Sequence, residues 1–284
     1  MKGNHTKVDE LLRASADITA WAVGGVSSVL LGGPIGGAVG GALGASLAHI
    51  LGDVADRALS LRERARIGTA AVYAIRAIKR RLAEGQQVRT DGFFTGSRSQ
   101  RSAADQLFEG LLLASKNEYE EKKLVLLGNL MASIVFKSSF SSADANLQMR
   151  RVEQLSYRQL CVLVTIFRRS LGEIGDFSPS IFSEGCENNE LLPKVQSVRE
   201  IATLFQEIFD LYQLRLVVTR RCFFGDSGWA PLEEIPLNSW RELVPVGLYN
   251  SFEGETLVCL IEPDAIPKED WERVAALLRY KPTA

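Results

Sequence analysis

Apolar and polar residues alternate with helical spacing along most of this chain, and one long uncharged stretch near its start departs from that pattern. Apolar residues three and four positions apart are typical of helices that bury one face. The pattern predicts helices over 53–84, 102–116, 116–135, 156–171, 195–211 and 267–280, and a further helix that begins at Ser141 or Ser142 and runs to residue 155. Residues 214–224, rich in β-branched and aromatic side chains, predict a strand, with 229–235 as candidate hairpin partner. We therefore expect a mainly α protein.

The uncharged stretch, residues 18–52, carries a small residue at every fourth position. Residues four apart lie on one face of a helix, and small residues on such a face let two helices approach closely, as they do in lipid. We expect a glycine-zipper helical hairpin, broken near Pro34, that self-associates through this stripe. The stripe consists of Gly24, Ser28, Gly32, Gly36, Gly40, Gly44, Ala48 and Gly52.

Three interpretations of residues 18–52 remain open. A membrane-inserting hairpin is favoured, although its arms of roughly 14 and 17 residues are short against the usual span of about 17–25. A tightly packed soluble hairpin comes second. A flexible glycine-rich loop comes third, because glycine costs about 1 kcal/mol per helix position relative to alanine.

Charge is distributed unevenly, although the formal net charge is only −1. Residues 53–101 hold eleven Lys and Arg against five Asp and Glu, whereas residues 181–284 hold ten against seventeen. Basic residues directly after an apolar stretch are typical of the cytoplasmic side of a membrane segment. The helix over 53–84 fits either an anionic bilayer surface or the outside of a helical bundle. Its candidate surface residues are Arg62, Arg66, Arg76, Lys79, Arg80 and Arg81.

Two shorter stretches look solvent-exposed. Residues 86–101 read as a loop with a turn at Asp91-Gly92 and two exposed aromatic rings, Phe93 and Phe94. The acidic cluster of Glu118, Glu120 and Glu121 alternates with lysines before and after it, which indicates a solvated helix face.

The pattern divides the chain into four parts: a polar leader over 1–17, the hairpin over 18–52, a helical domain over 53–155, and an α+β domain over 156–284. In the last part, the order helix, helix, strand, turn, strand over 156–235 is similar to a winged helix. Its acidic charge disfavours DNA binding, which depends on Lys and Arg at phosphates. We expect it to contact a protein partner.

Three motifs, RTDGFF at 89–94, KKL at 122–124 and LSYRQL at 155–160, resemble a group of uncharacterised bacterial helical proteins. Some of these are similar to products encoded beside phage-defence genes. The resemblance covers about residues 60–170 and brings no catalytic residues. It implies a bacterial protein that faces the cytosol and takes part in abortive infection.

The sequence contains no motif that indicates a reactive centre. The segment GDSG at 225–228 matches the loop around a serine-protease nucleophile, but that mechanism needs a histidine base, and His5 and His49 lie in the leader and the glycine stretch. Glycine spacing fits neither a dinucleotide fold nor a P-loop. The cysteines form no C-x-x-C pair and, with no secretory leader, are expected to be reduced. They are Cys161, Cys186, Cys222 and Cys259.

These observations lead to two functional expectations. The first is a non-enzymatic effector, without cofactor or metal, that inserts in the bacterial inner membrane, self-associates and perturbs it in anti-phage defence. Its partners are then identical copies, membrane lipid and a protein bound by residues 156–284. The alternative is a soluble winged-helix-like adaptor or regulator that binds protein or DNA.

Overall fold

The computed structural model describes residues 59–96, 101–177, 195–220, 234 and 236–279. Within these residues the chain forms eight α-helices and one two-stranded sheet, so the predicted mainly α fold is confirmed. The chain divides into two compact units. Unit 1 contains Met1–Leu155 together with Leu260–Glu262, and unit 2 contains Ser156–Cys259 and Pro263–Ala284. The leader and the glycine stripe lie outside the described residues.

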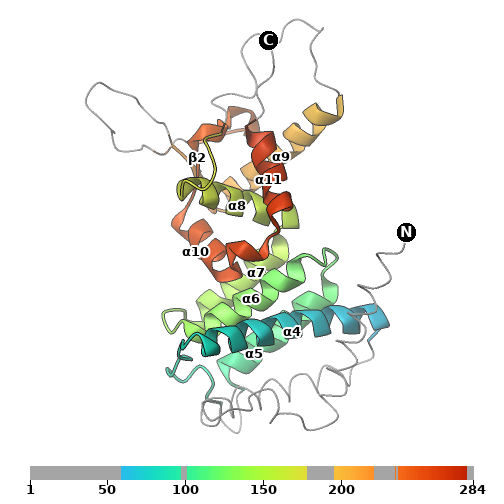
Figure 1. Ribbon diagram of the computed structural model, residues 1–284, viewed down its shortest axis with the longest axis vertical. Helices are drawn as coiled ribbons and strands as arrows, with labels where there is room; N and C mark the ends of the chain where they lie inside the picture. Colours follow the sequence, from blue (N-terminus) through green and yellow to red (C-terminus); the bar gives the residue numbers. More distant parts are fainter. Residues whose placement is uncertain (1–58, 97–100, 178–194, 221–233, 235, 280–284) are drawn as a thin grey trace, which may run out of the picture. The chain divides into compact units, whose positions relative to one another are not determined.

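Unit 1 is built around one buried helix. Helix α6 (Lys123–Phe136) is apolar on nearly all sides, and only Val125 and Phe136 within it are more than slightly accessible. Helices α4 (Leu61–Ala83) and α5 (Ala103–Asn117) lie beside it, as Figure 1 shows, and α7 (Ser142–Gln154) packs against α5 and α6. A helix that is apolar all round is stable in water only when other helices surround it.

Serine side chains fix where four of the helices begin. Ser60, Ser102, Ser141 and Ser156 each accept a hydrogen bond from the backbone N–H three residues later, and the side chain of that later residue accepts one in return. Such reciprocal capping satisfies N–H groups that the helix leaves free. The helix starts expected at residues 102, 141 and 156 are thus confirmed. The helix expected from residue 53 instead begins at Leu61, because Ser60 is extended and caps it.

The helix expected to run through residues 116–135 is interrupted. Helix α5 ends at Asn117, the chain is extended at Glu118, and α6 begins only at Lys123. The Glu118 carboxylate lies 2.5 Å from Lys123 Nζ, and both side chains are almost fully buried. Lys123 Nζ also donates to the Glu153 carbonyl at 3.1 Å. The prediction of a solvated face at residues 118–121 was therefore wrong for Glu118, because this ion pair turns the carboxylate inward.

The loop after α4 is folded back onto α6. Phe93 is 4% exposed and Phe94 half-buried, so the prediction of two exposed rings was wrong. The buried Arg89 guanidinium lies 4.2 Å from the centroid of the Phe93 ring and donates to the Phe140 carbonyl at 2.7 Å. Its planar cation both stacks on the ring and holds Asp91. Gly92, at φ +82°, makes the turn that the sequence predicts at Asp91-Gly92.

Unit 2 is organised around α8 (Tyr157–Ser170), whose residues from Gln159 to Ile166 are all buried. Helices α9 (Val195–Gln213) and α11 (Lys268–Leu278) and strand β2 (Leu248–Asn250) pack against it. Asn250 Nδ2 donates to the Leu163 carbonyl at 2.9 Å, and Thr165 Oγ1 to the Trp271 carbonyl at 3.2 Å. Side-chain hydrogen bonds thus attach the sheet and the last helix to α8.

The strand expected over 214–224 is shorter, and its main partner is a different segment. Strand β1 (Val217–Thr219) pairs antiparallel with β2, with Val217 opposite Asn250. From the segment proposed as hairpin partner, Glu234 forms a single bridge with Arg220, and residues 229–233 and 235 lie outside the described part. Helix α10 (Phe252–Ile261) was not predicted. It begins where Ser251 Oγ accepts a hydrogen bond from Gly254 N, and a side chain at Gly254 would collide with the Leu216 carbonyl.

Candidate functional site

Helix α4 presents one apolar face and one basic face. Its apolar positions, Ile67, Ala71, Ala74, Ile75 and Ile78, are at most 7% exposed and pack on α5 and α6. This helix is therefore the outside of a bundle, and its apolar face is not available to lipid. Among the helices that the structure describes, none is both long enough and apolar enough to cross a bilayer.

The basic face of α4 contains Arg62, Arg64, Arg76 and Lys79, all exposed, which we name the α4 basic surface. No other described residue forms an ion pair with any of these four side chains. Three of them, Arg62, Arg76 and Lys79, are among the surface residues predicted from the sequence, and Arg64 is not. Of the others it named, Arg66 is half-buried and donates to the Lys116 carbonyl at 3.4 Å, with its guanidinium 5.7 Å from the Tyr119 ring centroid.

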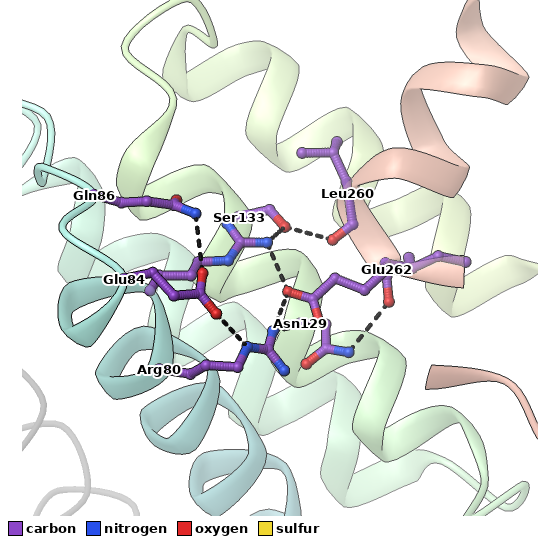
Figure 2. Close-up of polar contacts among 9 residues, drawn as sticks. Arg80, Glu84, Gln86, Asn129, Ser133, Leu260 and Glu262 are labelled. Atoms are coloured by element: carbon purple, nitrogen blue, oxygen red, sulfur yellow. Dashed lines mark hydrogen bonds and ion pairs between the residues drawn. The ribbon is translucent and has the colours of Figure 1, made fainter. Parts of the chain in front are cut away.

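Arg80 and Arg81, in the last turn of α4, are not free surface cations. Both bind the carboxylate of Glu262, as Figure 2 shows for the labelled Arg80 and Glu262. Arg80 Nη2 lies 2.5 Å from each oxygen of that carboxylate, and Arg81 Nη2 lies 2.8 Å from Oε1. Arg80 also lies 3.7 Å from the Glu84 carboxylate. We name Arg80, Arg81 and Ser133 the anion site.

Side chains of α6 hold the two backbone carbonyls that directly precede Glu262. Ser133 Oγ accepts from Arg81 Nη2 at 2.7 Å and donates to the Leu260 carbonyl at 2.6 Å, and Figure 2 shows Ser133 pointing at Leu260. Asn129 Nδ2 donates to the Ile261 carbonyl at 3.2 Å. These carbonyls end α10 and have no partner within the helix, so the two donors act as a cap supplied by α6.

Burial makes Arg81 the dominant group of the anion site. Its residue is 9% exposed, whereas the side chain of Arg80 is 53% exposed. An exposed pair such as Arg80 with Glu262 contributes about 0–1 kcal/mol. Leaving a buried charge such as Arg81 without its counter-ion costs about 3–5 kcal/mol. The buried position of Arg81 therefore requires an anion. Arg80 adds a second guanidinium, which contacts both oxygens of the carboxylate.

Sequence reasoning placed Arg81 on the surface and did not identify Glu262. The inward position of Arg81 had one local signal, because residue 81 lies three, four and seven positions after the buried Ile78, Ala77 and Ala74. No local signal marked Glu262, which lies 181 residues away from Arg81 along the chain.

The anion site suits recognition of an oxyanion. Two guanidinium groups converge on the carboxylate oxygens, and the Ser133 hydroxyl accepts a hydrogen bond from one of these guanidinium groups. Guanidinium matches the geometry of both carboxylate and phosphate. Among the residues described, no three His, Cys, Asp or Glu side chains gather as a metal site. Cys161 is buried and Cys259 is exposed, whereas Cys186 and Cys222 lie outside the described residues.

The basic pair of unit 2 is used internally. Arg168 binds the carboxylates of Glu173 at 2.5 Å and Asp264 at 2.6 Å. Arg169 donates to the Val246 carbonyl at 3.0 Å, and its guanidinium lies 4.8 Å from the centroid of the Tyr249 ring. Both cations therefore serve the packing of unit 2.

Comparison with known proteins identifies no relative: no family model matches this chain, and neither a curated protein nor a solved structure matches it.

Proposed function

We propose that this protein is a bacterial effector that acts on the inner membrane from the cytoplasm, with residues 18–52 as its membrane-inserting and self-associating part. The α4 basic surface carries the proposal. Its four exposed cations, without ion-pair partners among the described residues, belong to α4, which begins nine residues after the end of the uncharged stretch at residue 52. Membrane damage after insertion would serve abortive infection.

The α4 basic surface and residues 18–52 are expected to contribute differently to membrane binding. A basic residue near an anionic bilayer contributes about 1 kcal/mol, so the α4 basic surface contributes about 4 kcal/mol in all. That corresponds to a dissociation constant of about 1 mM, which is too weak to hold the protein on a membrane. The surface therefore orients unit 1, and residues 18–52 must supply the lasting attachment.

Flotation with lipid vesicles tests whether residues 18–52 attach the protein to the membrane and whether the α4 basic surface binds anionic lipid. The full chain should float with vesicles containing phosphatidylglycerol, and a chain lacking residues 18–52 should remain at the bottom. Replacing Arg62, Arg64, Arg76 and Lys79 by Gln should weaken binding to anionic vesicles and leave binding to neutral vesicles unchanged. The matched control replaces four exposed cations of unit 2 by Gln: Arg199, Arg241, Lys268 and Arg273. Equal flotation of the full chain and the deletion would exclude the proposal.

Self-association through the glycine stripe is tested by Gly40→Leu. Leucine at the middle of the stripe would keep neighbouring helices apart, yet it raises apolarity and helix propensity, the latter by about 1 kcal/mol. Membrane partitioning should persist or rise, while oligomer size in detergent and toxicity in cells should fall. A tightly packed soluble hairpin would instead lose about 1–3 kcal/mol of stability. No change in stability, assembly or toxicity would favour a flexible loop.

A soluble adaptor with a winged-helix-like unit 2 is the second candidate, and the internal use of Arg168 and Arg169 favours protein over DNA as its partner. Phosphate recognition needs free cations, and these two are already bound within unit 2. If the full chain and the chain lacking residues 18–52 stay equally soluble in fractionated cells, this candidate takes precedence. Salt-dependent binding of a duplex DNA by the full chain would instead favour DNA over protein as the partner.

A further inference from the structure

We propose that the anion site binds the phosphate of an anionic lipid headgroup, and that Glu262 occupies this site in the described structure as an internal inhibitor of membrane binding. The inference rests on the proposed function and adds its regulation. Glu262 neutralises the two arginines that follow directly on the α4 basic surface. Its displacement would add the exposed Arg80 to that surface and leave the buried Arg81 to bind the incoming phosphate.

The geometry of the carboxylate is that of a bound oxyanion. Both Glu262 oxygens are held by Arg80, and one of them also by Arg81 Nη2, which donates to Ser133 Oγ as well. A phosphate presents more acceptor oxygens than a carboxylate to the same donors. Because guanidinium groups bind either anion through paired N–H groups, a phosphate can replace the carboxylate without rearrangement of α4.

The site is open to an incoming anion. The side chains of Glu262 and Arg80 are 20% and 53% exposed, so the Arg80 edge of the pair faces solvent. Arg76 lies one turn before Arg80 on the same helix face, and Lys79 is adjacent. A headgroup that approaches the α4 basic surface therefore meets the anion site as a continuation of it.

Two features favour the replacement of Glu262 by another anion at the anion site. The buried Arg81 requires an anion at all times, so Glu262 can leave only when another anion enters. Glu262 also has φ +60°, a left-handed conformation that non-glycine residues rarely adopt, and Pro263 follows it. Release of Glu262 from the anion site would let this residue leave the left-handed conformation.

The test compares the full chain with Glu262→Gln in titrations with phosphatidylglycerol vesicles. Each arginine released near an anionic surface contributes about 1 kcal/mol, so the variant should need at least about fivefold less lipid for half-maximal binding. Glu255→Gln is the matched control, because it removes the same charge from an exposed position of α10. An equal gain in this control would overturn the inference, since net charge alone would then explain it.

Hydrogen exchange of the unmodified full chain gives a second measurement that does not depend on how the variant folds. Saturating phosphatidylglycerol vesicles should speed exchange of the peptide that contains Leu260–Glu262, and neutral vesicles should not. Inorganic phosphate at millimolar concentration distinguishes the source of the anion: acceleration by phosphate alone, without vesicles, would assign the site to a free phosphate and overturn the lipid assignment. Unchanged exchange with all three additions would overturn the anion site itself.

The two proposals fail separately. If Glu262→Gln and the unmodified chain bind vesicles equally, while the Gln replacements on the α4 basic surface weaken binding, the membrane function stands and the inhibitory role of Glu262 is excluded. If Glu262→Gln binds anionic vesicles more tightly than the unmodified chain does, the inhibitory role stands. If, in addition, the chain lacking residues 18–52 binds as tightly as the full chain, the insertion of residues 18–52 is excluded.

Discussion

At the scale of single residues, Gly128 sets the distance between α4 and α6. A Cβ atom at this position would lie 2.7 Å from Tyr73 Cβ and 2.8 Å from the Ala74 nitrogen. Neither backbone nor Cβ can move aside without separating the helices. We expect Gly128→Ala to lower the free energy of unfolding by about 1–3 kcal/mol, measured by urea denaturation.

Gly110 provides the control for this substitution. It lies inside α5, and nothing is within 4 Å of a Cβ added there. Gly110→Ala should stabilise the protein by about 0.5–1 kcal/mol, because alanine is the better helix former. Destabilisation of similar size by both substitutions would show that helix contact is not the reason for glycine at position 128.

At the scale of elements, the break between α5 and α6 depends on the buried pair of Glu118 and Lys123. Lys123→Met leaves the Glu118 carboxylate without its counter-ion in a site of low accessibility, so it should cost about 3–5 kcal/mol. Glu118→Gln added to Lys123→Met should recover much of this loss, since no charge then remains buried. Thermal unfolding of the single and double variants measures the difference. A double variant no more stable than Lys123→Met would assign the loss to the Glu153 carbonyl that Lys123 also binds.

Helix α7 should contribute a pH-dependent component to stability. Hydrogen bonds from the Ser141 hydroxyl and then the Ser141 backbone N–H hold the pKa of Asp144 below its usual 3.8. A carboxyl whose pKa is lower in the folded state stabilises the fold above its unfolded pKa, and this contribution is lost as the pH falls through the folded pKa.

Asp144→Asn should therefore lower the melting temperature near neutral pH, and the difference from the unmodified protein should shrink as the pH falls below 3.8. Melting curves over that range measure it. Glu121→Gln is the control, since no described residue forms a hydrogen bond with its exposed carboxylate. A difference for Asp144→Asn that stays constant with pH would contradict the assignment of the carboxylate as the acceptor.

At the scale of the whole molecule, unit 1 is completed by Leu260–Glu262, which come from far downstream in the chain. A chain that ends at residue 155 lacks the carbonyl that Asn129 binds. We expect Asn129→Ala to cost about 0.5–1.5 kcal/mol in the full chain and almost nothing in the shortened one. Hydrogen exchange of α6 peptides in urea measures the stability of unit 1 in both chains. Equal costs would show that Asn129 acts within α6 alone.

The sequence by itself determined the helical character of the protein and most of its helix starts. Ser102, Ser141 and Ser156 each cap a helix through a partner three residues later, so residues close in sequence contain the whole signal. Apolar spacing likewise identified the buried face of α4, because the period of a helix is a local property.

Only the tertiary structure decided which polar groups turn inward and which segments meet. Phe93 is buried because Arg89 stacks on it, Glu118 because Lys123 pairs with it, and Arg81 because Glu262 and Ser133 receive its guanidinium. Strand β1 pairs with β2 across a long separation, and Leu260–Glu262 join unit 1 in the same way. The physical reason is that burial of a charge or a backbone edge is favourable only when its partner is in place, and these partners are brought together by the fold.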